Sequence, residues 1–407
     1  MSNWLPLLAT LFIQAMVAMA LLTLPVMAPV AAKALAVSPA LVGIYVAITY
    51  AGAMFASLTS GTTVSRLGPI RVSQCGLLLC AAGLFLCAVP WLPAMGLGAL
   101  LIGLGYGPIT PASSQILART TPPAQMALVF SIKQTGVPVG AMMAGAIVPS
   151  LMLGVDWQWS LVLVAMACIL SAVLSQPMRD SMDDLRQANL PFHMASITTP
   201  LRMVLSHRAL TTMAACSFMF SMVQMSLTTY LVTYLHDDLA YGMVSAGLLL
   251  SVTQMGGIGG RIAWGVVADR WMGAQKTLAL LASLMALSAL ATALLLPVLP
   301  IWGIWAILLM FGASAIGWNG VYLAEVARQA PKGKASVATG GTLAFTFLGV
   351  VIGPPLFGAL STAFGTYRAG FLALVLTSSL CAIVLHRLKP SAPKPQPELN
   401  QPPSPQS

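Results

Sequence analysis

The sequence predicts an all-α membrane protein in which twelve transmembrane helices form two pseudo-symmetric halves of six helices each. Three observations predict this fold: the composition is very apolar, apolar runs long enough to cross a bilayer recur, and the second half repeats residue spacings of the first. With 58% hydrophobic and 7% charged residues, and a mean hydropathy of +0.88, the 407-residue chain has too little polar surface for a water-soluble globule.

The apolar runs are about 18–28 residues long, which matches the ~30 Å of hydrocarbon that a membrane helix must cross. They lack the strict alternation of a membrane barrel, and a helix satisfies its own backbone hydrogen bonds in lipid. The twelve runs lie near residues 7–30, 40–62, 72–90, 94–117, 126–150, 157–176, 209–234, 243–267, 276–296, 301–325, 336–363 and 367–386.

The basic residues predict the orientation, because cytoplasmic loops of membrane proteins are enriched in lysine and arginine. With both termini inside, the outer loops hold only Lys33 and Arg368, whereas the inner loops and the tail hold fifteen basic residues. We therefore expect a multi-pass protein of the cell inner membrane with both termini in the cytoplasm. The net charge of +10 then reflects membrane insertion, and no basic cluster with an aromatic platform indicates binding to nucleic acid.

The longest polar connection, residues 177–208, separates the two halves and carries three aspartates and four arginines. The predicted organisation is an N-terminal six-helix half over residues 1–176, a cytoplasmic linker loop over 177–208, a C-terminal six-helix half over 209–388, and a tail over 389–407. The tail is rich in proline and polar residues, so we expect it to be a disordered cytoplasmic end.

The second half of the sequence aligns with the first at two offsets in residue number, 204 and 213. The pairs at an offset of 204 are Gly43 with Gly247, Gly52 with Gly256, Gly61 with Gly265 and Arg66 with Arg270; those at 213 are Gly107 with Gly320, Gly136 with Gly349, Gly140 with Gly353 and Gly145 with Gly358. In a chain with 35 glycines, the alternative is that these glycines align by chance. Against chance, the loop residue Arg66 falls on Arg270 at the same offset of 204 as the glycine pairs. Such parallel repeats are typical of a transporter built from two rocking halves.

The sequence contains no pattern that predicts an enzyme, a cofactor or a metal site. No glycine-rich loop followed by Lys-Ser/Thr is present, so we do not expect ATP hydrolysis by this chain to drive transport. The six cysteines fall inside predicted helices without metal-ligand spacing, and we interpret them as small apolar packing residues.

Two loops carry related motifs, GTTVSRLGPIR at residues 61–71 and GVVADRWMGAQK at residues 265–276. They resemble the G-x-x-x-D-R-x-G-x-R/K motif of the major facilitator superfamily, which the chain resembles over essentially its whole length. The resemblance implies that these loops latch the two halves in one conformation, although Ser65 stands where the first motif usually has its aspartate. The alternative is that the loop charges only set the orientation. The predicted latch residues are Gly265, Asp269, Arg270, Gly61 and Arg66.

Longer phrases resemble one branch of this superfamily. GGIGGRIAWGVVADR in helix eight, SIKQTGVPVG in helix five and GWNGVYLAEVAR in helix ten are similar to the bacterial permeases related to monocarboxylate and cyanate transporters. The resemblance implies alternating access around a central site between helices 1, 2, 4 and 5 and their repeats 7, 8, 10 and 11.

Two cations lie within predicted membrane helices, where an ionisable residue is costly and is a functional candidate by default. Lys133 lies about seven residues, or roughly 10 Å, into helix five, and Arg261 lies at a similar depth in helix eight. None of the nine acidic residues falls in the middle of a predicted helix. Two cations without an accompanying acid predict a negatively charged ligand, with Arg261 suited to hold a carboxylate through two parallel hydrogen bonds.

Alternatives exist for both cations. Lys133 could extend its stem to the cytoplasmic interface, and Arg261 could bond to helix-end carbonyls or to Asp269. Of the polar helix residues that could line the site, we select Asn319 and Tyr50 as substrate-binding candidates, although helix-helix hydrogen bonding would explain each equally well. The other polar residues considered are Gln14, Tyr106, Gln134, Gln224 and Trp318.

The sequence therefore predicts a secondary active transporter, a monomer, that moves a small monocarboxylate-like organic anion by alternating access. Coupling to protons is expected, because a weak-acid substrate could bring the proton itself or the amine of Lys133 could exchange one. The alternative is a drug or metabolite exporter driven by proton antiport, which would normally need an acid embedded in the membrane. A receptor without transport activity is a further class, but it would usually add a soluble signalling domain.

Overall fold

The computed structural model describes residues 4–120, 129, 132–184, 198–331 and 335–387, and these residues form helices joined by short connections, with no strand among them. The helices of the first half are α1 (Trp4–Val26), α2 (Ala28–Ala34), α3 (Val42–Leu67), α4 (Pro69–Cys87), α5 (Leu92–Tyr106), α6 (Ile109–Thr120), α8 (Gly136–Leu151) and α9 (Trp157–Leu174). Those of the second half are α12 (Arg208–Thr233), α13 (Met243–Val267), α14 (Ala274–Leu294), α15 (Ile301–Ala315), α16 (Asn319–Gln329), α17 (Ala335–Phe364) and α18 (Tyr367–Arg387).

Eleven helical segments in the described part of the chain are long and apolar enough to cross a membrane. The twelfth predicted run, near residues 126–150, falls partly on residues outside the description, and its described part is α8 with a short helical stretch at residues 132–134. The predicted all-helical membrane fold is therefore confirmed.

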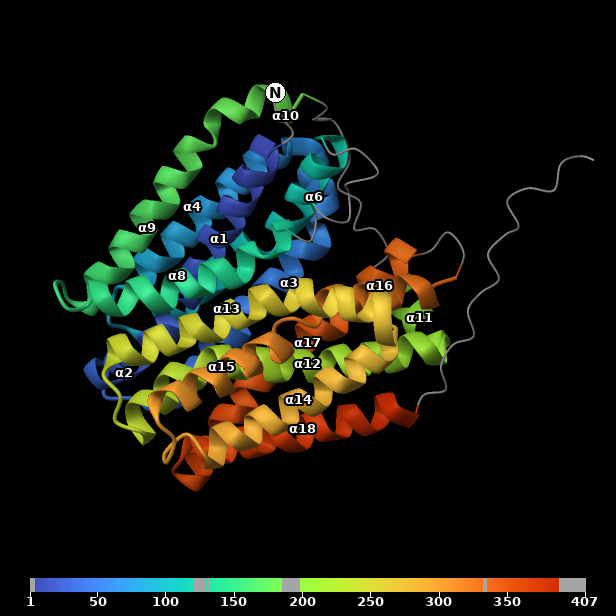
Figure 1. The fold of residues 1–407 in the computed structure, drawn as a ribbon. Coiled ribbons are helices and arrows are strands. Elements are labelled where there is room, and N and C mark those ends of the chain that lie inside the picture. Colours follow the sequence, from blue (N-terminus) through green and yellow to red (C-terminus); the bar gives the residue numbers. More distant parts are fainter. Residues whose placement is uncertain (1–3, 121–128, 130–131, 185–197, 332–334, 388–407) are drawn as a thin grey trace, which may run out of the picture.

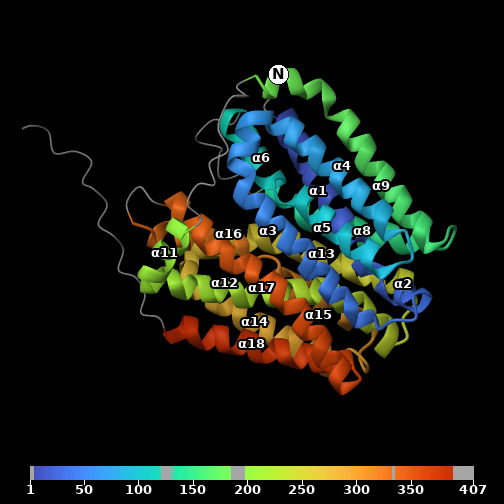
Figure 2. The same ribbon diagram turned by 180° about the vertical axis from the view of Figure 1, so that it is seen from behind.

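The helices gather into two groups that follow the two halves of the sequence (Figures 1 and 2). Within each group neighbours pack extensively, for example α4 with α5 and α14 with α18. The main contacts between the groups pair α8 with α13 and α3 with α17. The groups meet at the end where α2 lies and diverge toward the end where α6, α10 (Arg179–Met182), α11 (Thr198–Ser206) and α16 lie (Figure 1).

The predicted linker and tail lie partly outside the description. Residues 177–184 and 198–208 include the short helices α10 and α11, whereas residues 185–197 and the tail from residue 388 onward are not described. The bounds of the two halves, the linker and the disordered tail therefore stay predictions.

The two groups touch through backbone at the end where they meet, which we call the closed end. A Cβ atom added at Gly145 of α8 would lie 2.6 Å from the carbonyl oxygen of Gly247 of α13, so only glycine permits this approach. One turn further along α13, Ser251 donates a 3.0 Å hydrogen bond to the carbonyl of Met142. Tyr230 of α12 donates a 2.7 Å bond to the carbonyl of Ala40.

The predicted runs over 94–117 and 301–325 each form one membrane span, Leu92–Leu117 and Ile301–Val326, but each span contains an interrupted helix. The first run divides into α5 and α6 at Gly107 and Pro108, and the second divides into α15 and α16 at residues 316–318. Interrupted helices expose main-chain carbonyls and N–H groups inside the bundle, and such groups are tolerated where they face protein or a polar cavity. Both breaks lie at the level of the predicted site.

The two motif loops have related backbones. Gly68 and Gly273 both adopt a positive φ, +92° and +75°, and each directly precedes a membrane helix, α4 or α14. The second loop is one residue longer between its arginine and this glycine, and a π-helical turn, η5 (Ala268–Met272), accommodates the additional residue. The loops therefore share one design despite the length difference.

Candidate substrate site between the two halves

Lys133 is buried, with 1% of its surface exposed, and it lies in the helical stretch that leads into α8. Its Nζ donates to the side-chain oxygen of Gln14 on α1 at 3.0 Å and to the hydroxyl of Thr110 on α6 at 3.4 Å. These partners lie on helices of the same half, so the alternative in which the amine extends to the membrane surface is wrong. Thr110 is available as a partner because α6 begins just before it, after the break in the fourth run.

Arg261 of α13 joins the two halves. Its Nη1 donates a 2.7 Å hydrogen bond to the backbone carbonyl of Gln134, the residue next to Lys133, and its Nε donates to the carbonyl of Ile316 at 3.3 Å. The Gln134 carbonyl lacks its usual helical partner because the residue four positions later, Pro138, has no N–H. Arg261 is half-buried as a residue, and its two bonds match the alternative in which it bonds to helix-end carbonyls; they use only part of its donor capacity.

Asn319 belongs to the same cluster. Its Nδ2 lies 3.5 Å from the carbonyl oxygen of Ile316, the atom that also accepts from Arg261, and 3.5 Å from the side-chain oxygen of Gln224. The same oxygen of Gln224 accepts a 2.9 Å bond from the indole N–H of Trp318. The break between α15 and α16 therefore brings Asn319 to Arg261 through one shared acceptor.

Tyr50 lies between the halves but beside the polar cluster. Its ring makes an edge contact with Tyr106 of α5, at 5.9 Å between centroids, and packs at 6.5 Å against Phe347 of α17. These ring contacts place Tyr50 between α5 of the first half and α17 of the second, and no described contact joins it to Lys133 or Arg261.

The cluster brings two basic side chains together, because Arg261 donates to the carbonyl of Gln134, the residue next to Lys133. Neither Lys133 nor Arg261 has a carboxylate partner within the described residues, and the atoms that bind them are neutral oxygens. Because an ammonium group can only donate, the oxygen of Gln14 must face Lys133, and the buried amide nitrogen of Gln14 has no partner among the described residues. The site is therefore rich in donors and poor in acceptors.

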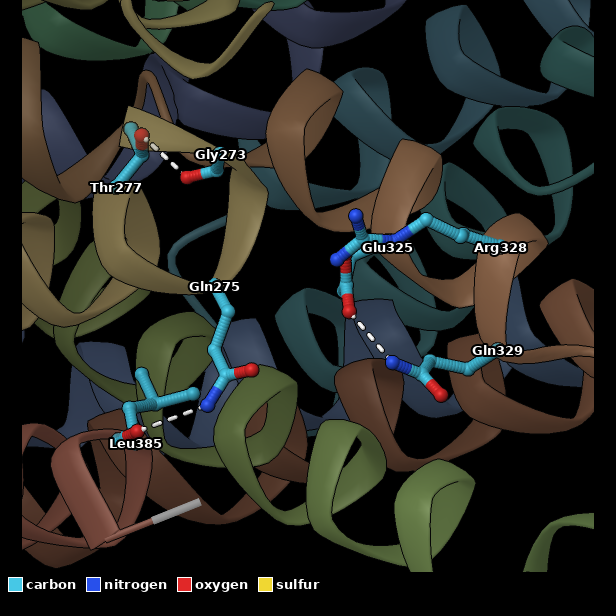
Figure 3. A network of polar contacts seen from close by, with 7 residues as sticks. All are labelled: Gly273, Gln275, Thr277, Glu325, Arg328, Gln329 and Leu385. Carbon is cyan, nitrogen blue, oxygen red and sulfur yellow. Dashed lines mark hydrogen bonds and ion pairs between the residues drawn. The ribbon is translucent and has the colours of Figure 1, made fainter. Parts of the chain in front are cut away.

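One acidic residue inside a membrane span was not anticipated from its sequence position. Glu325 on α16 is buried, with 1% exposed, and it pairs with Arg328 and accepts a 2.7 Å bond from Gln329 (Figure 3). The sequence placed it near a helix end, which is correct, but did not predict its burial. Its charge is balanced by Arg328, and none of its described contacts reaches Lys133 or Arg261.

The predicted latch residues occupy both motif loops. Gly61 and Arg66 lie in the last turns of α3, Gly265 lies near the end of α13, and Asp269 and exposed Arg270 lie in η5. The Asp269 side chain is outside the description. No described contact places these residues between the halves, so the latch stays a prediction.

A carboxylate does reach the first motif loop, from the linker. Buried Asp183 accepts hydrogen bonds from the backbone N–H groups of Ile70 at 2.8 Å and Arg71 at 3.1 Å, at the start of α4. A negative charge at a helix N-terminus is stabilising. Asp183 thus supplies an acid to the loop in which Ser65 replaces the motif aspartate.

Comparisons with known proteins agree with this architecture. Residues 7–342 match the family model of the Major Facilitator Superfamily. An uncharacterized MFS-type transporter of Mycobacterium tuberculosis (strain CDC 1551 / Oshkosh) is 25% identical over 334 residues, which cover 81% of this chain and 73% of that protein. The hexuronate transporter of Bacillus subtilis (strain 168) is 24% identical over 238 residues, which cover 54% of this chain and 56% of that protein.

The fold is also similar to solved structures. A mutant of the nucleoside transporter NupG superposes with a TM-score of 0.78 at 17% identity, over 95% of this chain and 99% of that chain. At this identity the likeness concerns the fold alone. Since the family model spans most of the chain and the helices adopt the corresponding fold, the chain belongs to the Major Facilitator Superfamily and is a transporter of that family.

Proposed function

We propose that this transporter moves a small, monocarboxylate-like organic anion by alternating access, coupled to protons. The observation that carries the proposal is the pair of cations where the halves meet, Lys133 and Arg261, which are held by neutral oxygens alone within the described residues. Desolvated cations without a counter-ion are costly, and an anion between the halves would lower that cost. The amide nitrogen of Gln14, which has no partner among the described residues, adds a donor to the same surroundings.

The position of Arg261 supports a coupling between binding of the substrate and movement of the two halves. Its bond to the Gln134 carbonyl links the two halves, and a guanidinium offers five donors in a planar fork that fits a carboxylate with two parallel bonds. A bound carboxylate would compete with the Gln134 carbonyl for the same donors. Substrate binding would thereby exchange a direct bond between the halves for one through the substrate.

The comparisons support an organic anion as the substrate class. The Bacillus subtilis relative is named as a hexuronate transporter, and a hexuronate carries a carboxylate. The phrases around Arg261 and Lys133 resemble the permeases related to monocarboxylate and cyanate transporters. Both lines favour a carboxylate between Arg261, Lys133 and Asn319, with Tyr50 at its edge.

We further assign the orientation and the latch as parts of this proposal. With basic loops in the cytoplasm of the inner membrane, the closed end faces outward and the halves diverge toward the cytoplasm. Gly265, Asp269, Arg270, Gly61 and Arg66 would then hold the cytoplasmic ends together in the opposite state, and Asp183 would fix the first loop for that contact. A proton would travel on a weak-acid substrate or on Lys133.

One observation favours the second candidate, efflux of a drug or metabolite by proton antiport. Glu325 is a buried carboxylate on α16, and a buried acid is the group that a proton-driven exporter of cations needs. Its pairing with Arg328 argues for a structural role, which leaves the anion carrier as the better-supported function.

The test is uptake of radiolabelled carboxylates into proteoliposomes under an imposed proton gradient. Arg261→Lys keeps the charge but loses the planar fork, so it should weaken apparent affinity by roughly ten- to a hundredfold. Lys133→Gln should also reduce uptake and change its pH dependence. The matched control is Lys33→Gln, which removes an exposed cation away from the cluster and should leave uptake unchanged.

Anion uptake at the wild-type rate in both Arg261→Lys and Lys133→Gln, at equal expression, would reject the anion site. Proton-driven efflux of cationic compounds that is lost in Glu325→Gln would instead support the exporter.

A further inference from the structure

Three amide side chains of the second half continue the hydrogen-bond network of Arg261. Asn319 of α16 shares the carbonyl of Ile316 with Arg261, Gln224 of α12 bonds to Asn319, and Gln254 of α13 joins through a hydroxyl. Gln224 and Asn319 are half-buried and Gln254 is buried. The donor or acceptor character of each partner fixes which atom of each amide faces it, and thus which atom remains for a ligand.

Trp318 fixes the orientation of Gln224. An indole N–H can only donate, so the atom of Gln224 that lies 2.9 Å from it must be the side-chain oxygen. The same oxygen also lies 3.5 Å from Nδ2 of Asn319. The amide nitrogen of Gln224 therefore has no partner among the described residues and offers its protons to a ligand.

The other two amides are oriented in the opposite sense. Thr228 donates its only hydroxyl proton to the backbone carbonyl of Gln224 at 2.9 Å, so its oxygen accepts from Nε2 of Gln254 at 3.4 Å. Nδ2 of Asn319 faces two acceptors, the side-chain oxygen of Gln224 and the carbonyl of Ile316. The side-chain oxygens of Gln254 and Asn319 are therefore acceptors without a partner in the described part of the chain.

The three remaining amide atoms are open to their surroundings. The enclosed polar atoms that lack a partner among the described residues include the amide nitrogen of Gln14 but none of these three. Next to Asn319, a Cβ atom added at the exposed Gly320 would meet no atom within 4 Å. Open space therefore adjoins the network at Asn319.

The cations and the amide network suit different chemical groups. Lys133 and Arg261 offer only donors, which fit a carboxylate. The oxygens of Asn319 and Gln254 would repel a carboxylate, and a hydrocarbon chain against them would leave them unpaired, which is unfavourable. A hydroxyl group both donates and accepts, so it can bind the nitrogen of Gln224 and the oxygen of Asn319 together.

We propose that the transported anion carries hydroxyl groups on its carbon chain, as a hydroxy acid or a sugar acid does, and that the amide network selects for them. The carboxylate lies at Arg261 and Lys133, and the hydroxyl groups bind Gln224, Asn319 and Gln254. Gln224 determines this specificity, because it orients Asn319 and also offers the free donor. This inference rests on the proposed function and specifies its substrate class.

The test is calorimetric titration of the purified full-length protein with gluconate and with hexanoate, two six-carbon carboxylates of which only gluconate carries hydroxyl groups. Wild-type protein should bind gluconate at least about tenfold more tightly. Gln224→Met keeps the length of the side chain but removes its amide, so it should reduce this preference by about fivefold to tenfold and leave the affinity for hexanoate unchanged. Asn319→Leu, which removes the neighbouring acceptor, should act in the same direction. An unchanged thermal midpoint verifies the fold of each variant.

The matched control is Gln74→Met. Gln74 of α4 also joins helices through its amide, which donates to the side chain of Gln176 and the carbonyl of Ala172, but it lies outside the network. Its preference for gluconate should equal that of wild type, and an equal loss in this variant would overturn the role of Gln224.

Two further outcomes separate this inference from the proposed function. Equal affinities for gluconate and hexanoate, both weakened in Arg261→Lys, would overturn the selection for hydroxyl groups and leave the anion site standing. Binding of neither acid, or binding of both that is unchanged in Arg261→Lys, would overturn the anion site and this inference with it.

Discussion

Arg261 on α13 donates a 2.7 Å hydrogen bond to the backbone carbonyl of Gln134, which belongs to the other half of the molecule. The carbonyl is free because Pro138, four residues later, cannot donate. A proline in one half thus creates the acceptor for an arginine in the other, and the strength of this contact can be changed without touching the arginine.

Pro138→Ala should weaken the contact, because the restored N–H competes with Arg261 for the Gln134 carbonyl. We expect a change of about 1 kcal/mol, or roughly fivefold in the ratio of conformers. Distances between spin labels at the ends of α6 and α16 measure this ratio. Val137→Ala, which adds no N–H, should leave the distribution unchanged; an equal shift in both variants would assign the effect to packing.

Gly145→Ala should disturb the closed end, because the new Cβ would lie 2.6 Å from the Gly247 carbonyl oxygen. We expect a loss of about 1–3 kcal/mol, as for overpacked cores, measured as a lower midpoint of thermal unfolding. Gly259→Ala on α13 is the control, since nothing lies within 4 Å of its Cβ position and alanine favours a helix. If the two variants melt alike, the glycine contact does not hold the halves together.

Asp183→Ala should remove the cap of α4 and cost about 0.5–2 kcal/mol of stability. Thermal unfolding again provides the measurement. Asp180→Ala removes an exposed carboxylate of α10, three residues before Asp183, and should have little effect. Equal melting of the two variants would mean that the 2.8 Å and 3.1 Å bonds at the start of α4 contribute nothing measurable.

Arg328→Ala should destabilise the protein more than Glu325→Gln combined with Arg328→Ala. The single change leaves a buried carboxylate without its cation, whereas the double change removes both charges. Because Arg328 is 51% exposed, we expect a difference of about 1–3 kcal/mol rather than the larger values of fully buried pairs. A double variant that is less stable than the single one would contradict this reading of the pair.

The proposed orientation predicts opposite labelling at two positions. A cysteine at Asp237, in the turn after α12, should react with an impermeant thiol reagent applied to intact cells, and a cysteine at Arg202 should not. Variants that lack the six native cysteines provide the background. The reverse pattern would invert the topology and place the closed end toward the cytoplasm.

The parts of the fold that follow from local physics were predictable. Apolar run length fixed the membrane helices, and the two cations were selected because they stand in apolar surroundings. Lys133 and Arg261 do meet at one place, and Gln134 connects them. They meet because α8, which follows Lys133 in the chain, packs against α13, which carries Arg261.

The rest depends on main-chain details that side-chain patterns do not encode. The carbonyl of Ile316 and the hydroxyl of Thr110 become ligands of the cations because two membrane runs break, and those breaks have only Gly107, Pro108 and Gly317 as weak sequence signals. The burial of Glu325 depends on how α16 sits against its neighbours, which distance from a helix end does not reveal. Asp183 was counted as a loop charge because its partner lies more than a hundred residues earlier.

The contact of Gly145 with Gly247 and the bond of Arg261 to Gln134 are both made by α13, at different heights along this helix. Gly247 and Arg261 are fourteen residues apart on α13, which corresponds to about 21 Å of helix. A rotation of one half by about 10° around the contact of Gly145 with Gly247 would move Arg261 by roughly 4 Å. This displacement exceeds the distance over which a hydrogen bond can form. A rotation that leaves the helices in contact at the closed end is therefore enough to break the bond between Arg261 and Gln134. Whether this bond forms thus depends on the angle between the two halves.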